Sequence, residues 1–183
     1  MEDRNPTAEY NLYIEAIKKN EDGTEEVVEK REYHNIVVDN AAVFQARRFQ
    51  PTGPVANGFQ YIAVGVGQGT GTAENPEVPD PQAVALREEI DRRAIDSWEY
   101  LTEGHDVSGS PTNILQLHVL FDYGEALLAG DNPSSIVELG LFGGDATGTL
   151  DSGELFAYRT FGMITKTIEL KFRVRWIVTF NAR

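Results

Sequence analysis

The sequence predicts a mainly β protein, an antiparallel β-sandwich with one or two short helices and an N-terminal hairpin extension. Three observations favour this fold class. Several segments alternate apolar and polar residues with the period of two that a half-buried strand requires. Short turns rich in Gly, Asn, Asp and Pro separate these segments. Parallel pairing would need regular crossover helices, which the pattern does not provide, so successive strands should run antiparallel.

Composition limits what the chain can be. Its 183 residues, 41% of them hydrophobic, suffice for one domain with a substantial core. The net charge of −13 disfavours binding to nucleic acid, because phosphate contacts need a basic surface. The absence of cysteine excludes disulfides and thiolate metal ligands. The N-terminal stretch MEDRNPTAEY is acidic and polar, and no apolar run approaches about 18 residues, so we expect synthesis in a cytosol and no membrane span.

The first two strands are expected at residues 10–17 and 25–38, where β-forming residues flank turn chemistry. Charged and apolar residues mix in both, so a peripheral part of the sheet and an exposed arm are both open interpretations. We favour an arm that lies on a neighbouring subunit. The chain is thereby divided into an N-terminal hairpin arm or extension, residues 1–38, and a β-sandwich domain, residues 39–183.

The next elements are shorter. A helix is expected at residues 41–49, with Asp39 or Asn40 as its N-cap. A compact apolar strand follows at residues 59–66, and a proline-rich surface loop follows that strand. Residues 86–95 combine a helical pattern of charges at i,i+4 with a strand start near the end of the segment.

Strands dominate the remainder of the chain. They are expected around Trp98, at residues 113–123, at 136–142 and at 155–161. The last one, residues 168–180, has an apolar residue at every even position and is the clearest strand in the sequence. Because 13 extended residues span roughly 43 Å, a bend or bulge is expected partway along it.

Motif searches predict no catalytic site, no cofactor and no metal ion. The glycines at positions 65–71 are spaced GxGxGxG, which matches neither GxGxxG nor GxxxxGK[ST]. They are better explained as a loop exit where side chains would obstruct a neighbour. Residues 143–154 contain Asp145, Asp151 and Glu154 but lack the EF-hand pattern, and the histidines lie in separate elements. No serine or acid pair has the sequence context of a hydrolase, so we expect a protein that is not an enzyme.

Basic residues gather on the odd-numbered side of the last strand, in an otherwise acidic chain. They are Lys171, Arg173 and Arg175, with Lys166 counted on the same side. Acids on neighbouring strands or an acidic partner must balance their charge. Both alternatives stay open, and pairing within the fold is favoured over a subunit contact.

Five short motifs follow one another along the chain, YIAVGVGQGT, LREEIDRRAI, IVELGLFGG, GELFAYRTFGMITKT and a terminal RWIVTF. Over about residues 35–180 their order and spacing resemble a family of tailed-bacteriophage tail-fibre and baseplate-associated proteins, with the pattern IAVGTGT, LxxExxR, IxEVGLF, LFAR, KT and WxIxF. Leu139 stands where the family more usually has Val, and Tyr158 is bulkier than usual. By position, the charged residues of the family pattern fall on Glu89, Arg92, Glu138, Arg159 and Lys166.

The resemblance implies a non-enzymatic virion structural protein, a tail-fibre or baseplate component. It would be assembled in several copies in the host cytoplasm, as a homo-oligomer bound to other tail or baseplate proteins of the virion. A collar, neck or capsid-surface protein is the first alternative. The second is a carbohydrate-binding module for a host-surface glycan, with stacking faces from Trp98, Tyr100, Tyr61 and Tyr158.

The three family positions nearest the C-terminus predict a local interaction. Glu138, Arg159 and Lys166 fall on successive strands of the expected sheet. We therefore expect them to form one partly buried ionic cluster that fixes the strand register.

Overall fold

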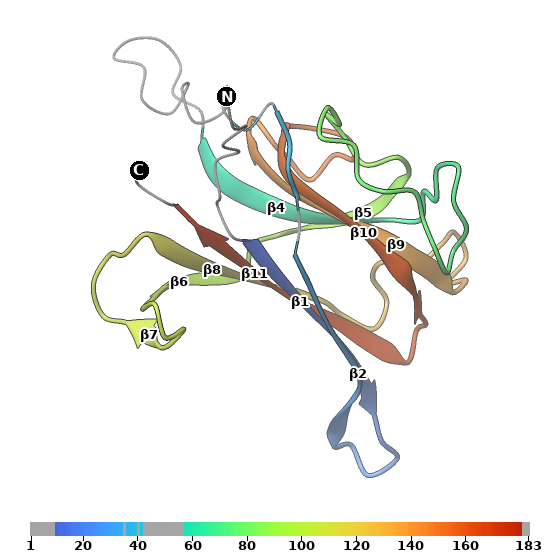
Figure 1. The fold of residues 1–183 in the computed structure, drawn as a ribbon. Coiled ribbons are helices and arrows are strands. Elements are labelled where there is room, and N and C mark those ends of the chain that lie inside the picture. Colours follow the sequence, from blue (N-terminus) through green and yellow to red (C-terminus); the bar gives the residue numbers. More distant parts are fainter. Residues whose placement is uncertain (1–9, 35, 40, 42–56, 181–183) are drawn as a thin grey trace.

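Two antiparallel β-sheets pack against each other in the computed structural model, which describes residues 10–34, 36–39, 41 and 57–180 (Figure 1). The predicted mainly β sandwich is confirmed. The six-stranded sheet has the order β2-β1-β11-β8-β6-β7 and the five-stranded sheet the order β3-β10-β9-β4-β5. In the described part of the chain, no helix is long and apolar enough to cross a bilayer.

The strands of the six-stranded sheet come from both halves of the chain. They are β1 (Tyr10–Lys19), β2 (Glu25–His34), β6 (Ser97–Leu101), β7 (Val107–Ser108), β8 (Ile114–Phe121) and β11 (Leu170–Thr179). The five-stranded sheet consists of β3 (Ile36–Val37), β4 (Asn57–Gly65), β5 (Glu89–Ala94), β9 (Ser134–Gly144) and β10 (Glu154–Lys166).

The main core lies between the two sheets, and β11 supplies its centre. Phe172, Val174, Trp176 and Val178 are all completely buried, so the even-numbered side is core as predicted at these four positions, whereas Phe180, just past the strand, is 40% exposed. Leu139, Leu141 and Phe156 of the opposite sheet belong to the same cluster. Alternation of two along β11 thus puts one side of the strand in the core and leaves the other for polar contacts.

The last strand is shorter and more regular than expected. A turn closed by the Leu170 N–H bonding to the Thr167 carbonyl at 3.1 Å precedes β11, and Ile168 is 51% exposed. No register shift interrupts the pairing of β11 with β1 or β8. The predicted irregularity lies in β10 instead, whose 13 residues shift register against β9 at two places.

The N-terminal hairpin is present, and it extends the chain's own six-stranded sheet, as the peripheral-sheet interpretation expects. β1 pairs with β11 from Tyr10 to Lys18 and lies inside the sheet, with β2 at the edge. Leu12 and Ile14 are buried in the main core. The charged residues of β2 suggested an exposed arm, whereas its partner β1 buries an apolar face in the core of the same chain.

The region before β6 also differs from expectation. Residues 89–94 form a strand, β5, that pairs with β4, so the helical charge pattern does not produce a helix. The helix predicted at residues 41–49 falls almost entirely outside the described residues. After β5 the chain crosses from one sheet to the other. The N–H of Ile95 donates to the carbonyl of Gln60 in β4, and the N–H of Asp96 donates to the carbonyl of His118 in β8, both at 2.9 Å.

Candidate functional site

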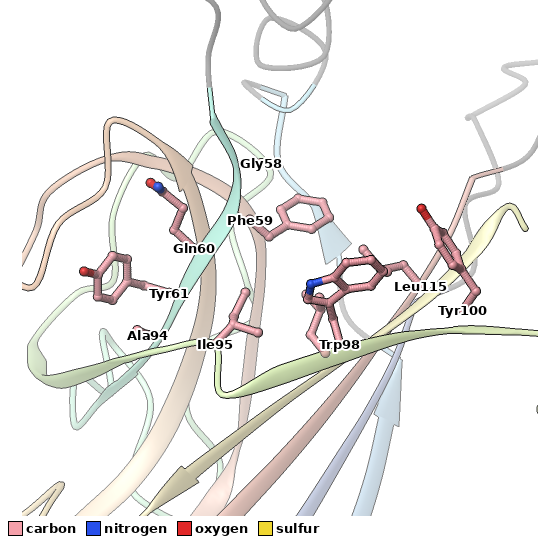
Figure 2. A pocket seen from close by; sticks show the side chains of 10 residues that line it. Gly58, Phe59, Gln60, Tyr61, Ala94, Ile95, Trp98, Tyr100 and Leu115 are labelled. Carbon is pink, nitrogen blue, oxygen red and sulfur yellow. The ribbon is translucent and has the colours of Figure 1, made fainter. Parts of the chain in front are cut away.

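A pocket of about 480 Å³ opens to solvent beside this crossover (Figure 2). β4 of one sheet and β6 and β8 of the other supply its walls. Phe59, Trp98 and Tyr100 bring aromatic rings to it, and Ile95, Leu115 and Leu117 form much of its apolar lining. The crossover fixes the position of β4 relative to β8, so the pocket lies between strands that are held in place by backbone hydrogen bonds.

Trp98 is the most exposed aromatic side chain of the pocket, at 59%. Its ring meets that of Tyr100 edge to face, with centroids 5.4 Å apart and planes at 82°. Phe59 approaches from the other sheet, and its ring packs 4.7 Å from that of Phe156 in the core. The rings of Trp98 and Tyr100 therefore form a corner on the side of the six-stranded sheet. The ring of Phe59 forms a fixed wall on the side of the five-stranded sheet.

Two of the four aromatic residues named for a glycan site meet in this way. Tyr61 also lines the pocket, but Figure 2 shows its ring pointing away from Trp98. Tyr158 is buried, with 1% of its surface exposed, and lies outside the pocket. Sequence reasoning missed Phe59, because its contribution depends on how the two sheets face each other.

Glu138 forms the centre of a second site, beneath the loop between β4 and β5. It is completely buried on β9, and its carboxylate accepts four hydrogen bonds. Oε1 accepts from the N–H groups of Gly67 at 3.1 Å and Glu88 at 2.9 Å. Oε2 accepts from the N–H of Arg87 and the hydroxyl of Tyr158, both at 3.1 Å. One carboxylate thus fastens both ends of this loop to the sheet.

Two of the four glycines at positions 65–71, Gly65 and Gly67, lie against this carboxylate. A Cβ added to Gly65 would lie 2.4 Å from Oε1 of Glu138, and one added to Gly67 would lie 2.8 Å from the same atom. Side chains at these positions would displace the carboxylate. The prediction that side chains here would obstruct a neighbour is confirmed: the neighbour is Glu138 for Gly65 and Gly67, and the loop's own residues 75–77 and Arg87 for Gly69 and Gly71.

Electrostatics around the loop favour the same arrangement. Burial raises the pKa of Tyr158, and the negative charge of Glu138 raises it further, so the phenol stays protonated as a donor. At the outer end of the loop, an ion pair with Arg87 lowers the pKa of Glu77 to about 2. Glu77 also accepts a hydrogen bond from the N–H of Thr70 at 3.0 Å. The loop is therefore anchored at its base by Glu138 and closed by Glu77.

Glu89 and Arg92 form a buried bidentate ion pair, with Nε–Oε1 and Nη2–Oε2 distances of 2.5 and 2.7 Å. Nη1 of Arg92 donates to the carbonyls of Thr147 and Ser152, at 3.1 and 2.8 Å. The N–H of Asp151 donates to Glu89 at 3.2 Å. The pair consequently holds the loop between β9 and β10 in the way that Glu138 holds the loop before β5.

The ionic cluster expected for Glu138, Arg159 and Lys166 does not form. Thr160 pairs opposite Glu138, whereas Arg159 pairs opposite Leu139 and so projects from the other face of the sheet. Its guanidinium lies 5.4 Å from the ring centre of Tyr33. Lys166 pairs opposite Ser134, beyond a register shift in β10, which separates it from the other two.

Lys166 is buried at a turn and does not share a side with the bases of β11. Only 1% of its surface is exposed. Its ammonium donates to the carbonyls of Tyr123 and Thr167, both at 3.1 Å. Burial lowers the pKa of Lys166 to about 8, although nearby acids act in the opposite direction.

The three bases of β11 find partners within the chain. Lys171 lies 2.9 Å from the carboxylate of Glu25, and Arg173 lies 3.1 Å from that of Glu15. The guanidinium of Arg175 covers the ring of Tyr13 at 4.8 Å. The favoured alternative, pairing inside the fold, therefore accounts for these residues.

The described residues contain no group of three His, Asp or Glu side chains placed to hold a metal ion. Asp145, Asp151 and Glu154 thus do not gather into such a group. The loop that carries them is held instead by its contacts with Glu89 and Arg92.

No protein-family model and no curated protein matches this chain. Its function must therefore be inferred from the contacts within the molecule and from the order of its motifs.

Proposed function

We propose that this chain is a structural component of the virion of a tailed bacteriophage, in a tail fibre or a baseplate, where it assembles in several copies. One observation carries the proposal. Glu89, Arg92 and Glu138, which occupy charged positions of the motif pattern, are buried and bonded to the chain's own loops. These motif residues hold the loops of the chain to its own sheets and so build a rigid frame, as expected for a protein whose role is structural.

The edge of the six-stranded sheet supports assembly with other copies or with other tail proteins. β2 is an edge strand of ten residues, and most of its side chains are at least partly exposed. Val27 and Val28 on this strand are 46% and 50% exposed. An exposed edge strand can pair with a strand of a neighbouring subunit, so β2 is the contact we propose for a homo-oligomer.

A collar, neck or capsid-surface position is the alternative within the same class. The buried loop anchors would serve such a protein equally well. No catalytic role is proposed for the chain, because the buried charged groups of its described residues, Glu89, Arg92, Glu138 and Lys166, are each bonded to the protein itself.

The test uses purified particles of the phage or prophage that encodes the chain. Quantitative mass spectrometry should find several copies per particle, and antibody labelling in electron micrographs should mark the tail. Labelling at the neck or capsid would favour the alternative. Absence from washed particles, with a known tail protein detected in the same sample, would contradict both. Light scattering of the purified chain should give a mass that is a multiple of one subunit.

A further inference from the structure

The aromatic pocket has no part in the frame described above. Trp98 leaves 59% of its surface exposed, although burying a large aromatic side chain is among the strongest contributions to stability. The other tryptophan, Trp176, is completely buried. An exposed tryptophan at the mouth of a pocket therefore suggests a surface that is covered by a ligand.

The pocket is formed before any ligand arrives. Trp98 lies on β6, whose backbone pairs it with Leu117 of β8. Tyr100, two residues along the same strand, packs its ring against that of Trp98. Phe59 is fixed against Phe156 on the other wall. A ligand would thus meet ordered rings and lose little affinity to rearrangement of the protein.

The lining indicates an uncharged ligand. None of the ten residues around the pocket is charged, in a chain whose net charge is −13. An ionic group in the pocket would lose hydration without gaining a partner of opposite charge. The polar side chains among the lining residues are neutral, and those nearest the exposed ring are the indole N–H of Trp98 and the hydroxyl of Tyr100, whereas the amide of Gln60 points away from Trp98 in Figure 2 and its oxygen is buried.

We propose that this pocket binds a neutral saccharide, with one sugar ring stacked on Trp98. A sugar ring combines a flat C–H face, which packs on an aromatic ring, with hydroxyls that need neutral hydrogen-bonding groups. The volume of about 480 Å³ lies in the range of small-molecule sites. The perpendicular rings of Trp98 and Tyr100 form a corner for one ring, whereas a proline-rich peptide would be better served by parallel aromatic ridges.

This inference goes beyond the tail assignment and does not depend on it. A structural tail protein need not bind a sugar, and a sugar-binding sandwich need not belong to a virion. The two proposals are therefore tested by separate experiments.

The full-length protein is screened on an array that carries neutral, sialylated and sulfated glycans, and the strongest ligand is then titrated by calorimetry. Binding to neutral glycans is expected. Trp98→Ala should weaken it about tenfold, and Tyr100→Phe about threefold through loss of one hydrogen bond. Val107→Ala, at a residue 65% exposed on β7, is the matched control and should bind like the wild type.

Folding is checked independently. In Trp98→Ala the remaining tryptophan is Trp176, which is completely buried, so blue-shifted emission that moves to the red only on denaturation shows that the core is intact. The proposal is overturned if no glycan binds, if only charged glycans bind, or if Trp98→Ala binds as tightly as the wild type. Binding of a proline-rich decapeptide that requires Trp98, without any glycan binding, would likewise overturn it in favour of a peptide groove.

Discussion

Both sheets carry charged residues away from the main core, but the two sets are used differently. Beside the five-stranded sheet, Glu138, Glu89 and Arg92 are sealed beneath loops and bond to backbone groups. On the six-stranded sheet, Lys171 and Arg173 reach sideways to acids on β1 and β2, and the Arg173 side chain is 43% exposed. Coverage by loops makes the difference, because a charge removed from water must be fully bonded whereas an exposed one need not be.

The largest loss of stability should come from removing one partner of the buried ion pair. Arg92→Met should lower the free energy of unfolding by about 3 to 5 kcal/mol, because it leaves the carboxylate of Glu89 buried without its cation. Chemical denaturation measures the loss. The double variant Glu89→Met with Arg92→Met is the control and should recover part of the stability. A single variant within about 1 kcal/mol of the wild type would show that the pair is not sealed.

Glu138→Gln tests the second buried site and should lower the free energy of unfolding by less. The amide keeps one acceptor oxygen but turns an N–H group toward the donor N–H of Arg87 or those of Gly67 and Glu88. One unsatisfied buried donor costs about 1 to 3 kcal/mol. Hydrogen exchange should accelerate at these three amides more than in the main core. Tyr158→Phe, which removes one hydroxyl donor, should cost about 1 kcal/mol, and equal exchange in Glu138→Gln and wild type would contradict the anchoring role.

Lys166 should make the stability of the protein depend on pH, because it is a buried cation bonded to two carbonyls. Its pKa is about 8 in the folded protein, against 10.5 for a free lysine. Between these values the unfolded chain binds more protons, so stability should rise with pH. Lys166→Met should reduce this rise, whereas Lys30→Met, at a side chain 61% exposed, should leave it unchanged. Equal pH dependence in Lys166→Met and wild type would contradict the burial effect.

The ion pairs on the surface of the six-stranded sheet should contribute least to stability. A double-mutant cycle with Glu15→Gln and Arg173→Gln measures the coupling of this pair, which lies at 3.1 Å. We expect less than about 1 kcal/mol, reduced further in high salt, because solvent screens the charges. A salt-independent coupling as large as that of the buried pair would remove the distinction between the two sheets.

The sequence predicted the structure well where a single alternation of apolar and polar residues decides which side chains are buried. The even-numbered residues of β11 could be assigned to the core because alternation alone fixes their side. Residues 86–95 were ambiguous, because charges spaced for a helix can equally be buried in pairs beneath a loop that the sequence does not place. The i,i+4 spacing that suggested a helix joins Glu89 to Arg93, whereas the buried ion pair on the strand joins Glu89 to Arg92.

The candidate sites depended on register, which a single sequence does not contain. Glu138 and Arg159 were expected together, but pairing opposite Leu139 puts Arg159 on the other face. The shift in β10 then carries Lys166 away from both. Trp98 and Tyr100 could be named from their period of two, whereas Phe59 joins them only through the packing of one sheet on the other.

The pairing of β1 with β11 has a consequence for biosynthesis. These neighbours lie at opposite ends of the described chain, so the hairpin of β1 and β2 has no sheet to join until β11 has been translated. A two-stranded hairpin is marginal alone, and pairing between distant segments folds slowly, in about milliseconds to seconds. The apolar sides of β1 and β8 meanwhile lack the strand that separates them, so we expect the nascent chain to expose apolar surface until β11 is made. Emergence of β11 from the ribosome is the event that commits the chain to its fold.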